Sequence, residues 1–392
     1  LYMFTKQTEK PAIFCCKSKI RREKMKQLML FLFLFVVING CSDGNFKSYK
    51  SYGGKTYDSA RSICPAPKGG YFLAGMSNSF KGNTIDGYLI KINERGKEQF
   101  AYNYGGSGDD RFYKIIRVKD GLVMCGYSDS DGAGLRDAYI VKTGYNGKIQ
   151  FESRIGGAGN DEAAGMCETA DGKIALIGNT SSFSGANAIE TYFSLHDSTG
   201  KQLLSRTYGG DKYEFGMSIV PADSGFAVAG RTSSRSKGSY DGFVMKLDAS
   251  GNTLAFKTFG TTGYDAFEDI IATSDGGFAA VGEIADTAKD GNVSQIYLVK
   301  LDSSLNKVWE KTFGGKMLDM GKTVIEDNGN FVISGTTDSF GNGSSDIFLL
   351  KTDAMGNSLW MSTFGGRKDE YAAGAVKSPD GGYVVAGWTG TY

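Results

Sequence analysis

Carboxylates recur at one fixed place in this 392-residue chain. Each stands four residues after the third position of a header that usually reads aromatic-Gly-Gly. The members of this acidic column are Asp58, Asp110, Asp161, Glu214, Asp265, Asp319 and Glu370. A ring of carboxylates could bind a cation or a cationic ligand group. Alternatively, each acid accepts backbone N–H groups in its own turn, and its presence in every repeat favours that structural role.

Two more charged columns flank one expected strand of each repeat. A second, mostly acidic column precedes the strand; its members are Asp86, Asp137, Glu190, Asp241, Gln295 and Asp346, and Gln295 is the only uncharged one. A basic column ends it, with Lys91, Lys142, Lys246, Lys300 and Lys351, and with Leu195 as the exception. We predict that these side chains fix loops and blade edges. A charged surface for a ligand is the alternative.

Residues for covalent or metal catalysis are scarce. The single histidine, His196, has no cysteine or serine partner in a nucleophilic arrangement. Cys64, Cys125 and Cys167 occupy columns that hold Ile, Val or Ala in other repeats, so we predict buried thiols. A disulfide or a metal site is the alternative, although the cysteine spacing matches no metal motif. We predict no catalytic residue, no metal and no cofactor.

The elements that must position these columns repeat with a period of about 52 residues. The third header position falls at Gly54, Gly106, Gly157, Gly210, Thr261, Gly315 and Gly366. Each repeat holds four short apolar or aromatic runs bounded by turn residues; in the fourth repeat they are 215–221, 226–230, 241–248 and 254–259. We name these strands a, b, c and d. A long period with four strands predicts a β-propeller.

Glycine has a fixed place inside every predicted strand b. These glycines are Gly75, Gly126, Gly178, Gly230, Gly282, Gly335 and Gly387. Glycine weakens a strand unless another backbone approaches closely, so we predict a crowded position near the centre of the assembly. The c–d turns read Asp-x-x-Gly, but the fifth repeat has Leu305-Asn306 in place of Gly-Asn. We expect Asn306 to tolerate the left-handed conformation there.

Two segments resemble a known repeat. Residues 104–110 (YGGSGDD) and 346–353 (DIFLLKTD) look like the SBBP-type bacterial β-propeller repeat. The resemblance extends from about Asn45 to the last residue. It implies a propeller in an extracytoplasmic protein. It implies little about activity, because that repeat occurs in proteins of varied role.

The fold class that we predict is an all-β propeller of seven blades, each a four-stranded antiparallel sheet. Six repeats supply all four strands, whereas the seventh supplies only a and b, over 369–389. Residues 46–52 would close the last blade as its d strand, since closure removes an exposed edge. That blade is expected to lack strand c. The alternative is a truncated reading of a longer gene.

The N-terminal segment resembles a targeting signal. An apolar run, Leu28 to Ile38, is too short to span a bilayer and follows Met25-Lys26. Residues 38–41 (INGC) resemble a bacterial lipobox, which implies that Cys41 becomes the lipidated first residue. The predicted divisions are an upstream extension from a wrong start (1–24), a lipoprotein signal peptide (25–40), a lipidated Cys and tether (41–45) and the propeller (46–392). An ordinary signal peptide with an incidental Cys is the alternative, as is a longer charged leader for 1–24.

The net charge limits the classes of binding partner that we expect. The whole chain carries 44 basic and 43 acidic residues, and residues 1–40 hold eight basic and two acidic ones. The predicted mature part therefore has 36 basic and 41 acidic residues, a net charge of −5. This argues against nucleic acid, which needs a basic face. We predict a monomeric outer-membrane lipoprotein of a double-membraned bacterium, facing the periplasm or the cell surface, with the membrane as partner through Cys41.

The b–c loops vary most between repeats. They span 76–85, 127–136, 179–189, 231–240, 283–294 and 336–345. Binding residues often sit on loops held by a rigid scaffold, so we predict a protein or glycan ligand on this face. The predicted function is a binding or scaffolding module rather than an enzyme. A polysaccharide-active enzyme would need paired carboxylates that are not repeated in every blade; a purely structural envelope protein is the third interpretation.

Overall fold

The computed structural model describes residues 34–40, 46–80, 84–183, 188–223, 225–285 and 293–390. The predicted extension, most of the predicted signal peptide, and Cys41 with its tether therefore lie outside the described residues. The described residues belong to one compact unit, and their regular elements are all strands. None of them forms a helix long and apolar enough to cross a membrane.

Strands alternate with short turns along the whole unit. The first two repeats form β3 (Asp58–Pro65), β4 (Tyr71–Ser77), β5 (Asp86–Ile92), β6 (Glu98–Tyr104), β7 (Asp110–Val118), β8 (Gly121–Ser128), β9 (Asp137–Thr143) and β10 (Ile149–Ile155). The next two form β11 (Asp161–Glu168), β12 (Ile174–Thr180), β13 (Glu190–His196), β14 (Gln202–Tyr208), β15 (Glu214–Ala222), β16 (Gly225–Thr232), β17 (Asp241–Asp248) and β18 (Thr253–Phe259). The fifth and sixth form β19 (Ala266–Ala272), β20 (Phe278–Ala285), β21 (Ser294–Leu301), β22 (Lys307–Phe313), β23 (Asp319–Asp327), β24 (Asn330–Thr337), β25 (Asp346–Thr352) and β26 (Ser358–Phe364). The chain ends contribute β1 (Leu34–Gly40), β2 (Phe46–Tyr52), β27 (Glu370–Lys377) and β28 (Tyr383–Thr389).

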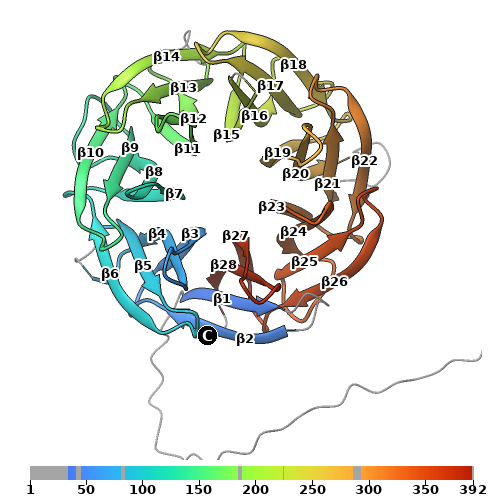
Figure 1. The fold of residues 1–392 in the computed structure, drawn as a ribbon. Coiled ribbons are helices and arrows are strands. Elements are labelled where there is room, and N and C mark those ends of the chain that lie inside the picture. Colours follow the sequence, from blue (N-terminus) through green and yellow to red (C-terminus); the bar gives the residue numbers. More distant parts are fainter. Residues whose placement is uncertain are drawn as a thin grey trace, which may run out of the picture. The chain divides into compact units, whose positions relative to one another are not determined.

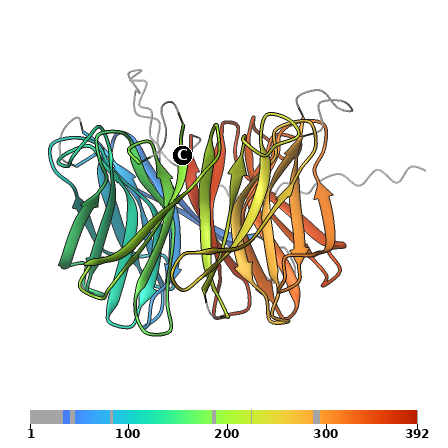
Figure 2. The same ribbon diagram turned by 90° about the horizontal axis from the view of Figure 1, so that it is seen from above.

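The sheets of this unit stand around a central axis (Figure 1), and Figure 2 shows their strands running between two faces. Every sheet has four antiparallel strands. Strand a of each repeat lies innermost and strand d outermost. Buried apolar clusters join neighbouring sheets; one of them packs Phe72 and Leu89 of the first repeat against Phe112 and Tyr139 of the second. Each sheet therefore buries its faces on its neighbours, as a propeller requires. The four strands predicted for the fourth repeat are confirmed as β15–β18.

The predicted fold class is wrong at the closing blade. Six blades, not seven, are each built from one continuous repeat. The remaining sheet has the order β2-β1-β28-β27, so it combines both chain ends and does not lack a third strand. Residues 34–40, which we assigned to the signal peptide, occupy that third place. An unpaired β28 edge would attract another strand, and the segment LFVVING has high β propensity.

Tyrosines of the outer strands tie one repeat to the next. Tyr104 donates to the Gly147 carbonyl at 2.7 Å, and Tyr208 donates to Gly251 at 2.6 Å. Each bond runs from the end of strand d to the c–d turn of the following repeat, which explains the aromatic residue in these headers. In the fifth repeat, Leu305 rather than Asn306 takes the left-handed conformation, with φ of 64°. Our expectation for Asn306 was wrong: its backbone N–H and its side chain bond Asp302 instead.

The crowding predicted at the strand-b glycines is confirmed. A Cβ at Gly178 would lie 1.8 Å from the Glu162 carbonyl oxygen of strand a. The other six glycines meet the equivalent carbonyl oxygen at 1.9–2.0 Å. Because this neighbour is backbone, no rotamer change could relieve the overlap. Strand a therefore lies against strand b at a distance that only glycine permits.

Candidate functional site: the central channel

Every innermost strand carries a β-bulge at the same place. The ladder between strands a and b skips one residue in each sheet. The skipped residues are Arg61, Tyr113, Ala164, Met217, Glu268, Lys322 and Ala373, which we call the channel ring. A bulge leaves one residue unpaired and re-aims its side chain. All seven members line one cavity of ≈ 420 Å³.

The bulge brings two consecutive side chains to the channel. In a regular strand, neighbouring residues point to opposite faces. Here Tyr113 and Lys114 both line the cavity, as do Glu268 and Asp269. Strict alternation from the sequence would have placed only one residue of each pair there. Sequence reasoning therefore missed the channel ring. Its signal was a column of unrelated residue types between the constant acidic and apolar columns.

A second set of variable residues surrounds the end of the channel nearest the d–a and b–c loops. We call it the mouth ring. It pairs one residue of strand a with the residue after the strand-b glycine. The pairs are Ser59–Met76, Arg111–Tyr127, Glu162–Asn179, Phe215–Arg231, Ala266–Glu283, Met320–Thr336 and Tyr371–Trp388. In the first six pairs, the strand-b member is the first residue of a b–c loop as we predicted it. The structure places these six residues in strand b instead.

Glu268 is the most strongly paired acid of the channel. Its side chain is 10% exposed and accepts from Lys322 Nζ at 2.7 Å, with Arg231 at 3.9 Å. Burial alone would raise the pKa of Glu268, but Lys322 and Arg231 outweigh it and hold the pKa below its usual value. Burial and the charge of Glu268 raise the pKa of neighbouring Glu283. Two non-repeated acids thus have pKa values shifted in opposite directions.

Asp269 links strands from opposite parts of the channel. It accepts from Ser218 Oγ at 2.9 Å and from the Val324 N–H at 3.2 Å. Lys114 Nζ, from β7, lies 3.9 Å from the same carboxylate on β19. These contacts join four repeats through one side chain. The channel is therefore crossed by a polar bridge rather than left as an open pore.

Aromatic rings form part of the channel wall. The Arg231 guanidinium lies 4.4 Å from the Phe215 ring centre, and Tyr240 and Tyr264 lie within 6.0 Å of it. Across the mouth, Tyr371 stacks on Trp388 with ring centres 4.5 Å apart. Rings and guanidinium planes together offer flat apolar surface with hydrogen-bond donors beside it. Such a wall suits a polar ligand with a flat apolar face.

The acidic column is buried at the d–a turns. Each acid accepts the backbone N–H of the third header position, as Asp110 does from Gly106 at 2.9 Å. Several also accept hydroxyl groups of the b–c loop, such as Ser79 on Asp58 at 2.7 Å. Burial raises the pKa of Asp58 and of Asp265 in spite of these bonds. The hydrogen bonds are those of the structural role; cation binding stays a prediction. Among the described residues, no three acids, histidines or cysteines gather as metal ligands.

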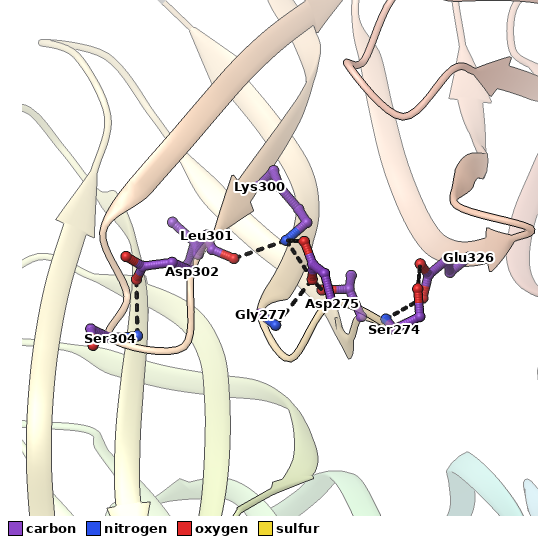
Figure 3. A network of polar contacts seen from close by, with 9 residues as sticks. Ser274, Asp275, Gly277, Lys300, Leu301, Asp302, Ser304 and Glu326 are labelled. Atoms are coloured by element: carbon purple, nitrogen blue, oxygen red, sulfur yellow. Dashed lines mark hydrogen bonds and ion pairs between the residues drawn. The ribbon is translucent and has the colours of Figure 1, made fainter.

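The basic column holds turns at the opposite face, as predicted. Lys300 bonds Asp275 at 2.8 Å and the Leu301 carbonyl at 3.1 Å, which ties strand c to the a–b turn (Figure 3). The neighbouring Ser274 donates to Glu326 of the next repeat. Lys91 and Lys351 make similar bonds to their own a–b turns. These lysines are thus fixed by the fold.

The thiols and the histidine are internal. Cys64, Cys125 and Cys167 are buried and free, as the apolar columns predicted. Burial raises the pKa of each to about 12, so they stay protonated. His196 is buried and has a serine partner that sequence reasoning missed, since its Nε2 lies 2.9 Å from Ser194 Oγ; burial lowers the pKa of His196. Neither kind of residue lines the channel cavity.

Comparison with known proteins identifies the fold but not the function. No family model and no curated protein sequence matches the chain. A putative 6-phosphogluconolactonase from Bacteroides uniformis superposes with a TM-score of 0.50 at 12% identity, covering 85% of this chain and 99% of that one. One from Bacteroides fragilis gives 0.50 and 12%, covering 87% and 97%. A puromycin hydrolase mutant also gives 0.50 and 12%, covering 91% of this chain and 56% of that one.

The chain is a β-propeller. At such low identity the likeness extends to the fold alone. The chemistry of this propeller has to be inferred from its own channel and mouth rings.

Proposed function

We propose that this propeller is a lipid-anchored, extracytoplasmic binding or scaffolding module of the SBBP type, and that its ligand is a protein or a glycan. The observation that carries the proposal is the variability of the channel and mouth rings. A residue that only maintains the fold is needed in every blade, whereas the channel-ring and mouth-ring positions hold side chains of different chemistry in different blades. Binding sites are built in this way, with a few polar groups placed on a rigid frame. Exposed Phe80, Phe183 and Phe340 on the b–c loops add apolar surface to the same face.

The ligand is tested by a glycan and polysaccharide array, probed with the full chain in detergent. We expect retained glycans, with binding weakened at least about tenfold by Trp388→Ala, because stacking on an aromatic ring contributes strongly to sugar recognition. Leu254→Ala, on the outer strand β18, is the control. Silence of the whole array would exclude a glycan and direct the search to protein partners of the envelope.

The anchor rests on residues 38–41. Metabolic labelling with a fatty-acid analogue should mark the wild-type chain and not the Cys41→Ser variant. Label on both, or on neither, would contradict the anchor. Cleavage before Cys41 would also remove β1, so the anchored chain would have an empty third place in its closing sheet.

An enzyme acting on a polysaccharide is the second candidate. It is favoured by Glu268 and Glu283, since pairs of acids with oppositely shifted pKa values serve as base and acid in catalysis. Following turnover on each array hit separates the two functions. Cleavage that Glu283→Gln abolishes would identify an enzyme.

A further inference from the structure

One cation of the channel ring has no counter-charge. Among the described residues, no oxygen accepts a hydrogen bond from the Arg61 guanidinium, and no carboxylate forms an ion pair with it. Its Nε is buried without a partner. By contrast, Lys114, Arg231 and Lys322 each face a carboxylate in the same cavity. A guanidinium carries five donors in a planar fork, and the buried Nε of Arg61 has no acceptor among the described residues.

A second donor, the Tyr113 hydroxyl, lines the same cavity as Arg61. Tyr113 is the next member of the ring, and Arg61 and Arg111 both lie close enough to oppose the rise that burial causes in the pKa of Tyr113. Arg111 has its own counter-charge, because its Nη2 lies 3.5 Å from Asp109, although its Nε is buried without a partner. Arg61 on β3 and Tyr113 on β7 therefore supply the donors that line this region of the cavity.

Space for an acceptor lies beside them. On the other side of Arg61, strand β27 contributes only small side chains to the cavity, from Ala372 to Ala375. Ala373 is the channel-ring member of that strand. A cavity of ≈ 420 Å³ is large enough for a sugar-sized group, and here its wall is empty of bulky side chains next to an unpaired cation.

We infer that Arg61, with Tyr113, binds an anionic group of the ligand, a carboxylate or a phosphate, over the small residues of β27. The inference rests on the proposed binding function and names the chemical class of the ligand. A carboxylate or a phosphate accepts two parallel hydrogen bonds from a guanidinium, which Lys could not provide. The group would also neutralise the charge of Arg61, which no described carboxylate compensates.

The test is calorimetric titration of the full chain with sodium glucuronate, with glucose as the matched uncharged sugar and inorganic phosphate as a second arm. We expect glucuronate or phosphate to bind and glucose not to bind. Arg61→Gln should weaken binding by about tenfold or more, because a charge-assisted bidentate contact is lost. Ala373→Leu should abolish binding by filling the space while it keeps every charge. Arg95→Gln, at an exposed c–d turn, should stay within about twofold of the wild type.

The outcomes separate the inference from the proposed function. Equal binding by wild type and Arg61→Gln, with unchanged melting temperatures, would overturn the inference. Failure of both anions to bind, while neutral glycans are retained on the array, would overturn it too and leave the binding function in place. Stronger binding of phosphate than of glucuronate would assign the site to a phosphorylated ligand.

Discussion

Replacing Asp327 with alanine should destabilise the protein by about 3–5 kcal/mol, since it removes one member of a buried ionic network. Asp327 is 4% exposed at the a–b turn of the sixth repeat. It accepts from Lys351 Nζ at 2.8 Å and from the buried Tyr383 hydroxyl at 2.6 Å, and Lys377 Nζ pairs with its other oxygen. The substitution would remove the carboxylate that Lys351 and Tyr383 share between the sixth repeat and the closing sheet, and Lys351 would keep only neutral acceptors such as the Tyr383 hydroxyl at 3.1 Å.

Asp275→Ala is the matched control. Asp275 occupies the same turn one repeat earlier and pairs with Lys300 at 2.8 Å, but its side chain is 63% exposed (Figure 3). An exposed ion pair contributes about 1 kcal/mol or less. Urea denaturation of both variants measures the difference. Equal losses of stability would contradict the importance that we assign to burial at Asp327.

The Asp327 effect should depend on pH in one direction. Burial opposes ionisation, but Lys351, Lys377 and Tyr383 outweigh it and depress the pKa of Asp327 far below its usual value. A depressed pKa stabilises the fold fully above the unfolded pKa of about 3.9, and this contribution is lost as the pH falls towards the folded pKa. The gap between wild type and Asp327→Ala should therefore be constant near neutrality and shrink below about pH 4. A gap that widens on acidification would contradict the assignment.

Gly178→Ala should be the second large effect. The added Cβ would lie 1.8 Å from the Glu162 oxygen and 2.9 Å from the Ala163 Cα, so β11 would have to move away from β12. Overpacking against rigid neighbours costs about 3 kcal/mol. Because β11 carries Glu162 and Ala164, the shift should also distort the channel. Chemical denaturation measures the loss of stability.

Gly374→Ala is the control for the glycine. It also lies on a channel-lining strand, but its nearest neighbour would be 3.4 Å from the new Cβ, which is ordinary contact. We expect a change within about 0.5 kcal/mol. A harmless Gly178→Ala would mean that strands a and b are not as close as described.

The sequence predicted what every repeat must satisfy. The acidic column and the strand-b glycines answer local needs that recur in every repeat, and the Lys300-type lysines answer one that recurs in five repeats; the period alone revealed all three. The closing sheet did not follow from the repeat, because β1 comes from a segment whose apolar residues also fit a signal peptide. The left-handed Leu305 was missed since residue preference there yields to the geometry of the turn.

The channel was hidden for a different reason. Arg61 and Glu268 belong to one column that has no common residue type, so a search for shared features passes over them. Their direction also depends on a one-residue slip in the ladder, which alternation cannot foresee. The predicted b–c binding face lies next to the mouth ring. Each predicted b–c loop begins at a mouth-ring residue, such as Arg231.

The bulges also make this propeller a candidate receptor scaffold for protein engineering. A residue outside the ladder can change from arginine to alanine, as between β3 and β27, while the strands on either side keep their register. Seven such positions face one cavity, and each can be encoded independently. A combinatorial library over these codons alone would sample many cavity chemistries on one unchanged frame, and selection against dyes or metabolites could then yield sensors for molecules that the natural chain never encounters.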